Sequence, residues 1–98
     1  MKLLAVFSAV ERPDSRELFA AHGREELLHV WKLYEEGLVR ELYQRDGPGA
    51  VLILEAPGLA DARRGLDELP LVAAGAIGYE LLELRPFAAY GPLLDAGQ

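Results

Sequence analysis

Residues 50–54, with the sequence AVLIL, are apolar at every position. A strand that covers a core on one face and meets water on the other alternates apolar and polar side chains. This segment does not alternate, so we predict a strand over residues 50–56 that is buried on both faces. Glu55 follows the apolar run directly, and its carboxylate therefore needs a partner or a chemical role.

Three further segments have the composition of strands, and turn residues separate them: Lys2–Ala9, residues 38–45 and Ile77–Leu84. Residues 38–45 alternate polar and apolar side chains, which is typical of an edge strand. The sequence RDGPG predicts a turn over residues 46–49, and Pro57-Gly58 ends the third strand. The chain therefore carries four predicted strands.

A helix is predicted after the first strand. Residues 12–15, RPDS, offer a helix start, and Gly23 predicts a break near His22, because glycine is costly inside a helix. From Arg24 onward, helical spacing predicts one buried face and a charged outer face that includes Glu26. The predicted buried residues are Leu27, Val30, Trp31, Tyr34 and Leu38. Gly37 is predicted to end the helix in a left-handed conformation.

A second helix is predicted over residues 59–69. Pro70 is expected to stop it, because proline disrupts a helix interior. Its predicted buried residues are Leu59, Ala62, Leu66 and Leu69. A bend over residues 70–76 then leads into the last strand.

The element order is strand, helix, strand, strand, helix, strand, which is the ferredoxin-like βαββαβ pattern of an α+β fold. Its four-stranded antiparallel sheet has the first and third strands in the middle, and these are the most apolar strands of the chain. Two helices cover one face only, so we predict that the other face packs against a second subunit, giving a dimeric α+β barrel. The alternative is a monomer whose apolar tail folds under the sheet.

Length and charge limit the remaining possibilities. A chain of 98 residues is one domain, 1–98, and its tail, residues 86–98, is apolar enough to pack on the partner subunit. The formal net charge of -6 argues against nucleic acid and anionic membranes as partners. The apolar run near the N-terminus is short and is followed by Glu11 and Arg12, which is unlike a signal peptide, so we expect a cytoplasmic protein.

The segments EEGLVRELYQR and LDELPL, with the closing Arg85-Pro86, resemble the muconolactone isomerase family of the dimeric α+β barrel superfamily. The resemblance covers residues 24–86. Its best matches are Gly37, Arg40, Leu42, Tyr43, Leu66, Leu69-Pro70-Leu71 and Pro86. It implies a barrel closed between two subunits and, for the isomerase itself, a higher oligomer. The superfamily holds several activities, so the fold does not select the reaction.

Moving a double bond within a lactone needs a base, a proton donor and a cation for a substrate carboxylate. Glu55 and His29 are the candidate catalytic residues, and Arg40 is the candidate clamp for the carboxylate. If residues 46–49 form a four-residue loop, Arg40 lies opposite Glu55 on the neighbouring strand. The pair then either fixes the strand register or lines a ligand pocket.

Other polar and aromatic residues have two interpretations each. His22 and His29 are seven residues apart, so they share a helical face if the helix is unbroken, as an acid and base or as two metal ligands; packed or solvated histidines are the alternative. Trp31, Tyr43 and Tyr79 are candidate substrate-binding residues, together with Tyr34, or they belong to the core. The chain has no cysteine and no cofactor-binding motif, so we expect neither a cofactor nor a metal.

Three classes of function remain open. The first is a cofactor-independent isomerase-like enzyme that acts on a small, mostly apolar acid or lactone. The second is a ligand-binding or accessory module without turnover, and the third is a purely structural oligomer. A pocket with Arg40 or His29 beside a carboxylate favours the enzyme, a purely apolar pocket favours the binding module, and a filled interior favours the structural protein.

Overall fold

A computed structural model describes residues 1–47 and 49–96. Pro48 of the predicted turn, and Gly97 and Gln98 of the predicted tail, lie outside the described residues. Four strands form one antiparallel sheet in the order β2-β3-β1-β4. Their bounds are β1 (Lys2–Ala9), β2 (Val39–Gln44), β3 (Ala50–Glu55) and β4 (Ile77–Leu84).

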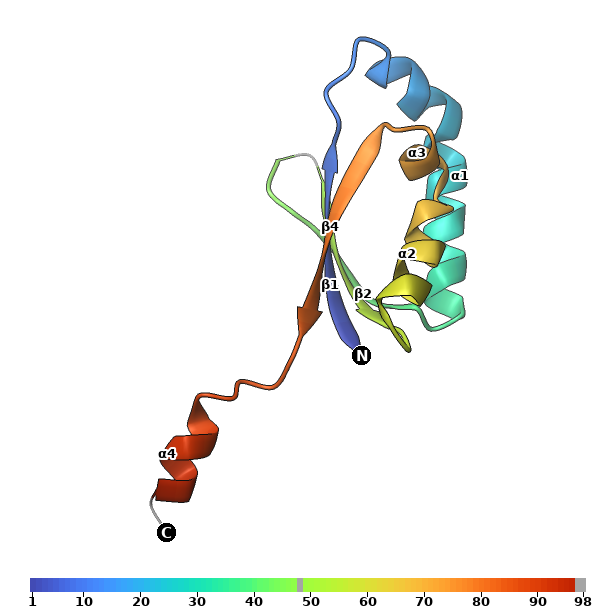
Figure 1. The fold of residues 1–98 in the computed structure, drawn as a ribbon. Helices are drawn as coiled ribbons and strands as arrows, with labels where there is room; N and C mark the ends of the chain where they lie inside the picture. The colour runs from blue at the N-terminus through green and yellow to red at the C-terminus, as the bar shows by residue number, and fades with distance from the viewer. Residues whose placement is uncertain (48, 97–98) are drawn as a thin grey trace.

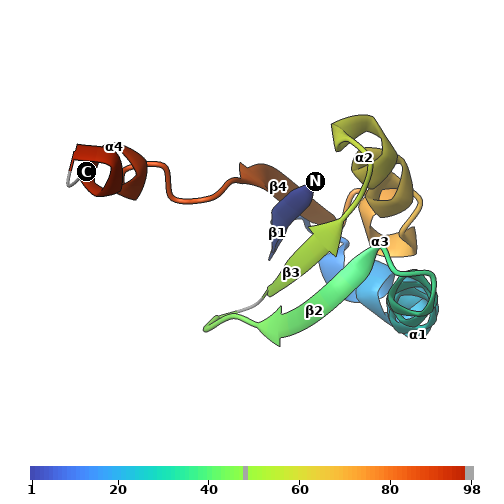
Figure 2. The same ribbon diagram turned by 90° about the horizontal axis from the view of Figure 1, so that it is seen from below.

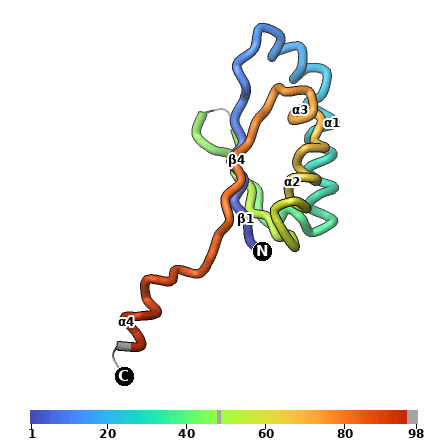
Figure 3. The backbone as a smooth tube through the Cα atoms, in the orientation of Figure 1, coloured from blue at the N-terminus to red at the C-terminus, as the bar shows by residue number. Residues whose placement is uncertain are grey.

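Of the four helices in the described part of the chain, three lie on one face of this sheet and the fourth lies away from it (Figure 1). Their bounds are α1 (Ser15–Glu35), α2 (Leu59–Asp67), α3 (Pro70–Ala73) and α4 (Tyr90–Ala96). The tube in Figure 3 shows the chain leaving the sheet after β4 and running outward to α4. The predicted ferredoxin-like fold with central first and third strands is confirmed.

The core lies between the sheet and the helices. Leu3 and Ala5 of β1 point toward the helices and are paired with Leu54 and Leu52 of β3. Leu66 of α2 packs against them and is fully buried. Replacing a buried leucine such as these with alanine typically costs about 2–5 kcal/mol.

No helix of residues 1–47 and 49–96 lies on the opposite face of the sheet, and we call it the open face. Leu4, Val6, Val51 and Ile53 point to this side and are half-buried, while Leu82 is 48% exposed. The run over residues 50–54 is therefore covered by helices on one face and only partly shielded by neighbouring strands on the other. Its complete burial by a second subunit remains a prediction.

The predictions for α1 are wrong in two respects. The helix runs through Gly23 without a break, because packing against the sheet and α3 holds it together although glycine costs about 1 kcal/mol in a helix. The inward face carries Glu26 and Leu33, both buried. Leu27 and Trp31, predicted as buried, are 74% and 59% exposed.

Tyr34 is also exposed, and only two of the five residues of the predicted stripe, Val30 and Leu38, pack against the core. Gly37 follows the end of α1 with φ of 91°, so the predicted left-handed glycine is confirmed. Its amide donates to the Tyr34 carbonyl oxygen at 3.2 Å.

The second predicted helix is confirmed as α2, and the bend predicted over residues 70–76 contains the short helix α3. α2 ends at Asp67, and Pro70 starts α3, where its missing N–H is not required. Ala62, Leu66 and Leu69 are buried as predicted, whereas Leu59 is exposed.

The register between β2 and β3 differs from the prediction. Gln44 pairs with Ala50, and the Arg45 amide donates to the Gly49 carbonyl oxygen at 3.3 Å, so the connection is one residue shorter than assumed. An irregularity between Val39 and Glu41 shifts the register again. Arg40 therefore does not lie opposite Glu55.

Candidate functional site

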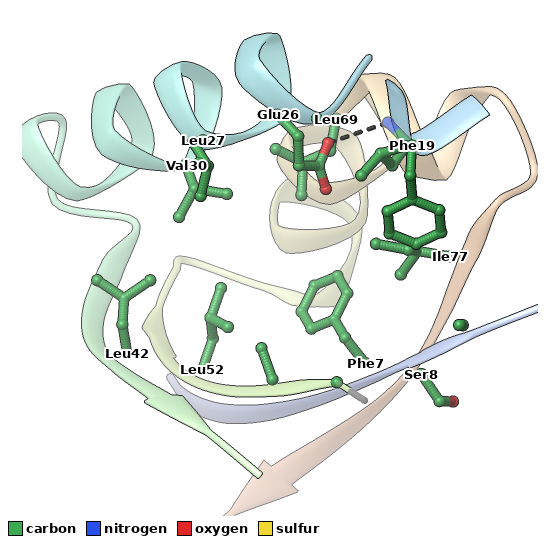
Figure 4. Close-up of a pocket in the computed structure, with 15 residues that line it drawn as sticks. Phe7, Ser8, Phe19, Glu26, Leu27, Val30, Leu42, Leu52, Leu69 and Ile77 are labelled. Carbon is green, nitrogen blue, oxygen red and sulfur yellow. Dashed lines mark hydrogen bonds between the residues drawn. The ribbon is translucent and has the colours of Figure 1, made fainter. Parts of the chain in front are cut away.

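A cavity of about 400 Å³ lies between α1 and the sheet (Figure 4). Phe7, Leu42 and Leu52 project into it from β1, β2 and β3. Leu27 and Val30 of α1 face them from the opposite side. Leu42 and Leu52 are paired across β2 and β3, so they lie side by side. The aliphatic side chains of α1 that face them leave the space between helix and sheet unfilled.

The segment around α3 forms the end wall of the cavity. Leu69, Leu71 and Ile77 line this wall, and Phe19 of α1 lies beside Ile77 (Figure 4). In the same view Phe7 and Ser8 point to opposite sides of β1, so the Ser8 hydroxyl faces away from the helices. The side chains that face the interior are almost all apolar.

Glu26 is the exception. Its side chain projects from α1 into the cavity, and the residue is only 8% exposed. Its Oε1 accepts a hydrogen bond from the Leu71 amide at 3.0 Å, the dashed line in Figure 4. This bond joins α1 to the end wall of the cavity.

Burial raises the pKa of the Glu26 carboxyl, because an apolar environment disfavours its charged form. The Leu71 amide and the positive charges of His29 and His22 act in the opposite direction but are weaker. The two histidines stand three residues after and four residues before Glu26, hence on neighbouring positions of the unbroken helix. They influence the carboxyl without lining the cavity.

This arrangement defines what the cavity can do. Among the described residues that line it, Glu26 is the only ionisable one, and no cation is present to neutralise a ligand's charge. A carboxyl with a raised pKa is a better proton acceptor when ionised and a hydrogen-bond donor when neutral. The cavity therefore suits a neutral, mostly apolar molecule with a carbonyl or hydroxyl group.

The predicted pair Arg40 and Glu55 is not formed. Arg40 Nε donates to the Gly37 carbonyl oxygen at 2.7 Å, and Glu55 Oε1 forms an ion pair with the Met1 amino group at 3.1 Å. Both residues line a second, polar hollow of about 450 Å³ that also contains Arg64. The shorter turn and the extra residue in β2 are the reason, since both change the register on which the prediction rested.

His29 lies on the outer side of α1, where it lines a shallow hollow with Glu25, Leu28 and Lys32. The enzyme hypothesis required His29 inside the pocket with a carboxylate, and His29 does not line the cavity. Within the described part of the chain, no group of three His, Asp or Glu side chains is placed to hold a metal ion.

The three aromatic candidates are not brought together. Trp31 stacks on Tyr34, with ring centroids 5.5 Å apart, on the exposed flank of α1. Tyr43 lies on β2, and its hydroxyl donates to Glu41 Oε1 at 2.6 Å, which raises the pKa of Tyr43.

Tyr79 of β4 contacts a residue that lines the cavity. Its ring packs on Phe7, with centroids 5.5 Å apart, and its hydroxyl donates to Asp67 Oδ1 at 2.6 Å. Burial, then the bond to Asp67, raises the pKa of Tyr79, and the Arg63 guanidinium lies 6.0 Å from the ring centre. Tyr79 thus fixes the position of a lining residue without lining the cavity itself.

Glu26 was missed because the sequence pattern placed it on the outer face of the helix. Its signal is visible in retrospect: Val30 and Leu33 follow it at four and seven residues, so the three share one face. Phe19 precedes it by seven residues and completes that stripe.

The sequence matches no family model and no curated protein. Its fold is similar to that of solved structures, among them 5-chloro-2-hydroxyhydroquinone dehydrochlorinase (TftG) from Burkholderia phenoliruptrix AC1100 in complex with 2,5-dihydroxybenzoquinone. The alignment has a TM-score of 0.65 and 16% identity, and it covers 85% of this chain and 93% of the other. At this identity the likeness concerns the fold, not the reaction.

No helix within residues 1–47 and 49–96 is both long and apolar enough to span a membrane.

Proposed function

We propose that this protein binds a small, neutral, mostly apolar ring compound, such as a lactone, in the cavity between α1 and the sheet, and that Glu26 transfers a proton on it. The observation that carries this proposal is the single buried carboxyl of Glu26 in an otherwise apolar cavity of about 400 Å³. Small-molecule sites typically have this size and this combination of an apolar lining with few polar groups.

The absence of a cation among the described lining residues favours a lactone over a free acid. A ligand carboxylate would enter an apolar space beside Glu26 without a positive partner, which is costly. A lactone carbonyl has no charge and can accept a hydrogen bond from the neutral Glu26 carboxyl.

The reaction that suits this site is a shift of a carbon–carbon double bond. The Glu26 carboxylate takes a proton from the carbon between the double bond and the carbonyl group, and the C–H electron pair passes into an enolate. The resulting carboxylic acid returns the proton to the far carbon of the former double bond, which restores the carboxylate. No cofactor or oxidant is consumed, and the raised pKa of Glu26 strengthens it as the base.

The likeness to TftG supports a ring-shaped ligand, since the TftG structure is a complex with 2,5-dihydroxybenzoquinone. Dehydrochlorination is the activity of that protein, and we do not extend it to this chain. The isomerase-like activity implied by the sequence resemblance agrees with a single proton-transferring carboxyl, provided that the lactone carries no free carboxylate.

A binding module without turnover is the second candidate function. The hydrogen bond between Glu26 and the Leu71 amide favours it, because this bond gives the carboxyl a structural role independent of catalysis. The two candidates differ in whether Glu26 exchanges protons with the ligand.

The test uses α-angelica lactone, a small unsaturated lactone, in heavy water. We expect NMR spectra to show deuterium entering the ring and the double bond moving in the presence of wild-type protein. The Glu26→Gln variant keeps an acceptor for the Leu71 amide but cannot transfer the proton, so it should bind without exchange. Binding without exchange in the wild type would support the module, and no binding by either protein would contradict the proposal.

We also propose that the open face of the sheet packs against the same face of a second copy in the cytoplasm. Leu4, Val6, Val51 and Ile53 form a continuous apolar surface there, and Leu82 extends it. Such a surface is typical of a contact between subunits.

A further inference from the structure

Besides the open face, two exposed apolar surfaces have no partner within the described residues. The first, which we call the α1 strip, consists of Leu27, Trp31 and Tyr34 of α1 with Leu42 of β2. Leu27 and Leu42 also line the cavity, so the strip forms its rim. While this rim is uncovered, water reaches the mouth of the cavity and the apolar side chains around it. A bound apolar ligand would then stay partly in contact with water, which weakens its binding.

The second surface is the described part of the tail, residues 86–96. It leaves the end of β4 and carries α4 away from the rest of the chain (Figures 1 and 3). Phe87 is 73% exposed, and Tyr90, Leu93 and Leu94 are exposed as well. Phe87 and Tyr90 already contact each other edge to face, with ring centroids 5.3 Å apart, so the two rings form one aromatic surface.

We infer that the tail of one copy covers the α1 strip of a second copy and closes the mouth of its cavity. This inference builds on the proposed function, because it assumes both the open-face contact and the cavity as the ligand site. Each ligand site is then completed by the tail of the partner subunit.

The tail begins where β4 ends, and the pairing of the strands shows which other segments lie at that end of the sheet. β4 ends at Leu84, which pairs with Lys2 at the start of β1, and Leu3 pairs with Leu54, which pairs with Val39 at the start of β2. The end of β4, the start of β2 and the end of α1 therefore lie at the same end of the sheet. The tail starts at the β4 edge, whereas the α1 strip lies at the β2 edge (Figure 2).

A two-fold axis parallel to the strands would bring the β4 edge of one copy next to the β2 edge of the other. Two identical sheets packed face to face about such an axis place β4 of one copy over β2 of the other and keep the same ends together. The tail then emerges next to the partner's α1 strip. On its own chain the tail would have to cross the open face, which the same contact buries.

The reach of the tail is sufficient. Residues 85–89 precede α4, and an extended chain spans at most about 3.3–3.6 Å per residue, so the link reaches about 17 Å. Packed sheets are about 10 Å apart, which leaves enough length to pass the β2 edge. α4 has 7 residues and is about 10 Å long, which equals the rise between Leu27 and Tyr34 on α1.

Engineered cysteines test the contact directly, because the natural chain has none. We would mix the Trp31→Cys variant with the Leu93→Cys variant, oxidise the mixture and separate the products on a denaturing gel. A disulfide-linked dimer of one chain of each variant is expected. Glu25→Cys on the outer side of α1 is the matched control and should cross-link at least tenfold less to Leu93→Cys.

The doubly substituted Trp31→Cys, Leu93→Cys chain shows whose strip the tail covers. A linked dimer supports the inference. A disulfide closed within one chain, cross-linking equal to the Glu25→Cys control, or no cross-link at all would overturn it. These outcomes do not depend on any ligand.

The effect on the cavity is measured with N-phenyl-1-naphthylamine, a neutral apolar fluorophore. Removing residues 86–98 should speed its dissociation at least tenfold, and an unchanged rate would overturn the closing role of the tail. If the wild-type protein does not bind the fluorophore, the ligand site fails while the cross-linking result still decides where the tail lies. The two proposals can therefore fail separately.

Discussion

Glu26 is the residue whose replacement tests the site most directly. Burial raises the pKa of its carboxyl above the ordinary value of 4.5 in the folded protein, while the unfolded chain titrates near that value. Between the two pKa values the folded state binds more protons than the unfolded state, so the free energy of unfolding falls as pH rises. The stabilising contribution is fully present below the unfolded pKa and is lost as pH passes through the folded pKa.

Two variants separate the charge from the hydrogen bond. Glu26→Gln cannot ionise but keeps an acceptor for the Leu71 amide, so its stability relative to wild type should increase with pH over this window. Glu26→Leu leaves the amide without an acceptor, which should cost about 1–3 kcal/mol at low pH. That deficit should shrink at high pH, because only the wild type loses stability through this carboxyl.

The assay is urea unfolding followed by far-UV circular dichroism, at one protein concentration and from about pH 3.5 to 8.5. The charges of His22 and His29 lower the pKa of Glu26, so both variants are repeated with glutamine at these two positions. Parallel stability curves for the wild type and Glu26→Gln would refute the reasoning, since they would show that Glu26 ionises as it does in water.

Three further predictions concern the cavity, the open face and the former candidate pair. Leu52→Trp should fill the cavity and abolish lactone binding in NMR titrations, whereas Leu52→Met should retain binding; equal binding by both would contradict the site. Ile53→Lys should reduce the mass found by light scattering from twice 10.8 kDa to 10.8 kDa, and an unchanged mass would exclude the open-face contact. Arg40→Ala should lower the free energy of unfolding by less than about 1 kcal/mol, because its guanidinium bonds an exposed Gly37 carbonyl; a loss of about 3–5 kcal/mol would indicate a buried pair with Glu55 after all.

The strands were predictable because short runs of apolar residues, separated by turn residues, specify them locally. β1 and β4 have the predicted bounds, and the apolar content of β1 and β3 placed both in the centre of the sheet. The register of β2 was not predictable in the same way. A one-residue change in the turn and an extra residue next to Val39 alter the pairing without changing the apolar pattern, since both depend on backbone hydrogen bonds.

The site was less accessible to sequence reasoning than the fold. α1 is apolar on two adjacent flanks, so its periodicity did not decide whether Trp31 or Leu33 faces the core. The burial of Glu26 depends on the Leu71 amide of α3, a helix that the sequence presented as a bend after a helix-stopping proline. A buried carboxylate is stable only with such a partner, and the partner lies 45 residues away in the chain.

The charge of Glu26 also determines which form of a lactone the cavity can hold. A lactone is neutral, but its ring-opened product carries a carboxylate, and no cation lines the described part of the cavity. Two negative charges about 4 Å apart repel by about 4 kcal/mol at an effective dielectric constant near 20. This corresponds to about a thousandfold weaker binding of the ring-opened acid whenever Glu26 is ionised. At low pH, where Glu26 is neutral, the discrimination should decrease, so the affinity ratio of lactone to acid should rise with pH. A ratio that does not change with pH would mean that the ligand does not bind beside Glu26.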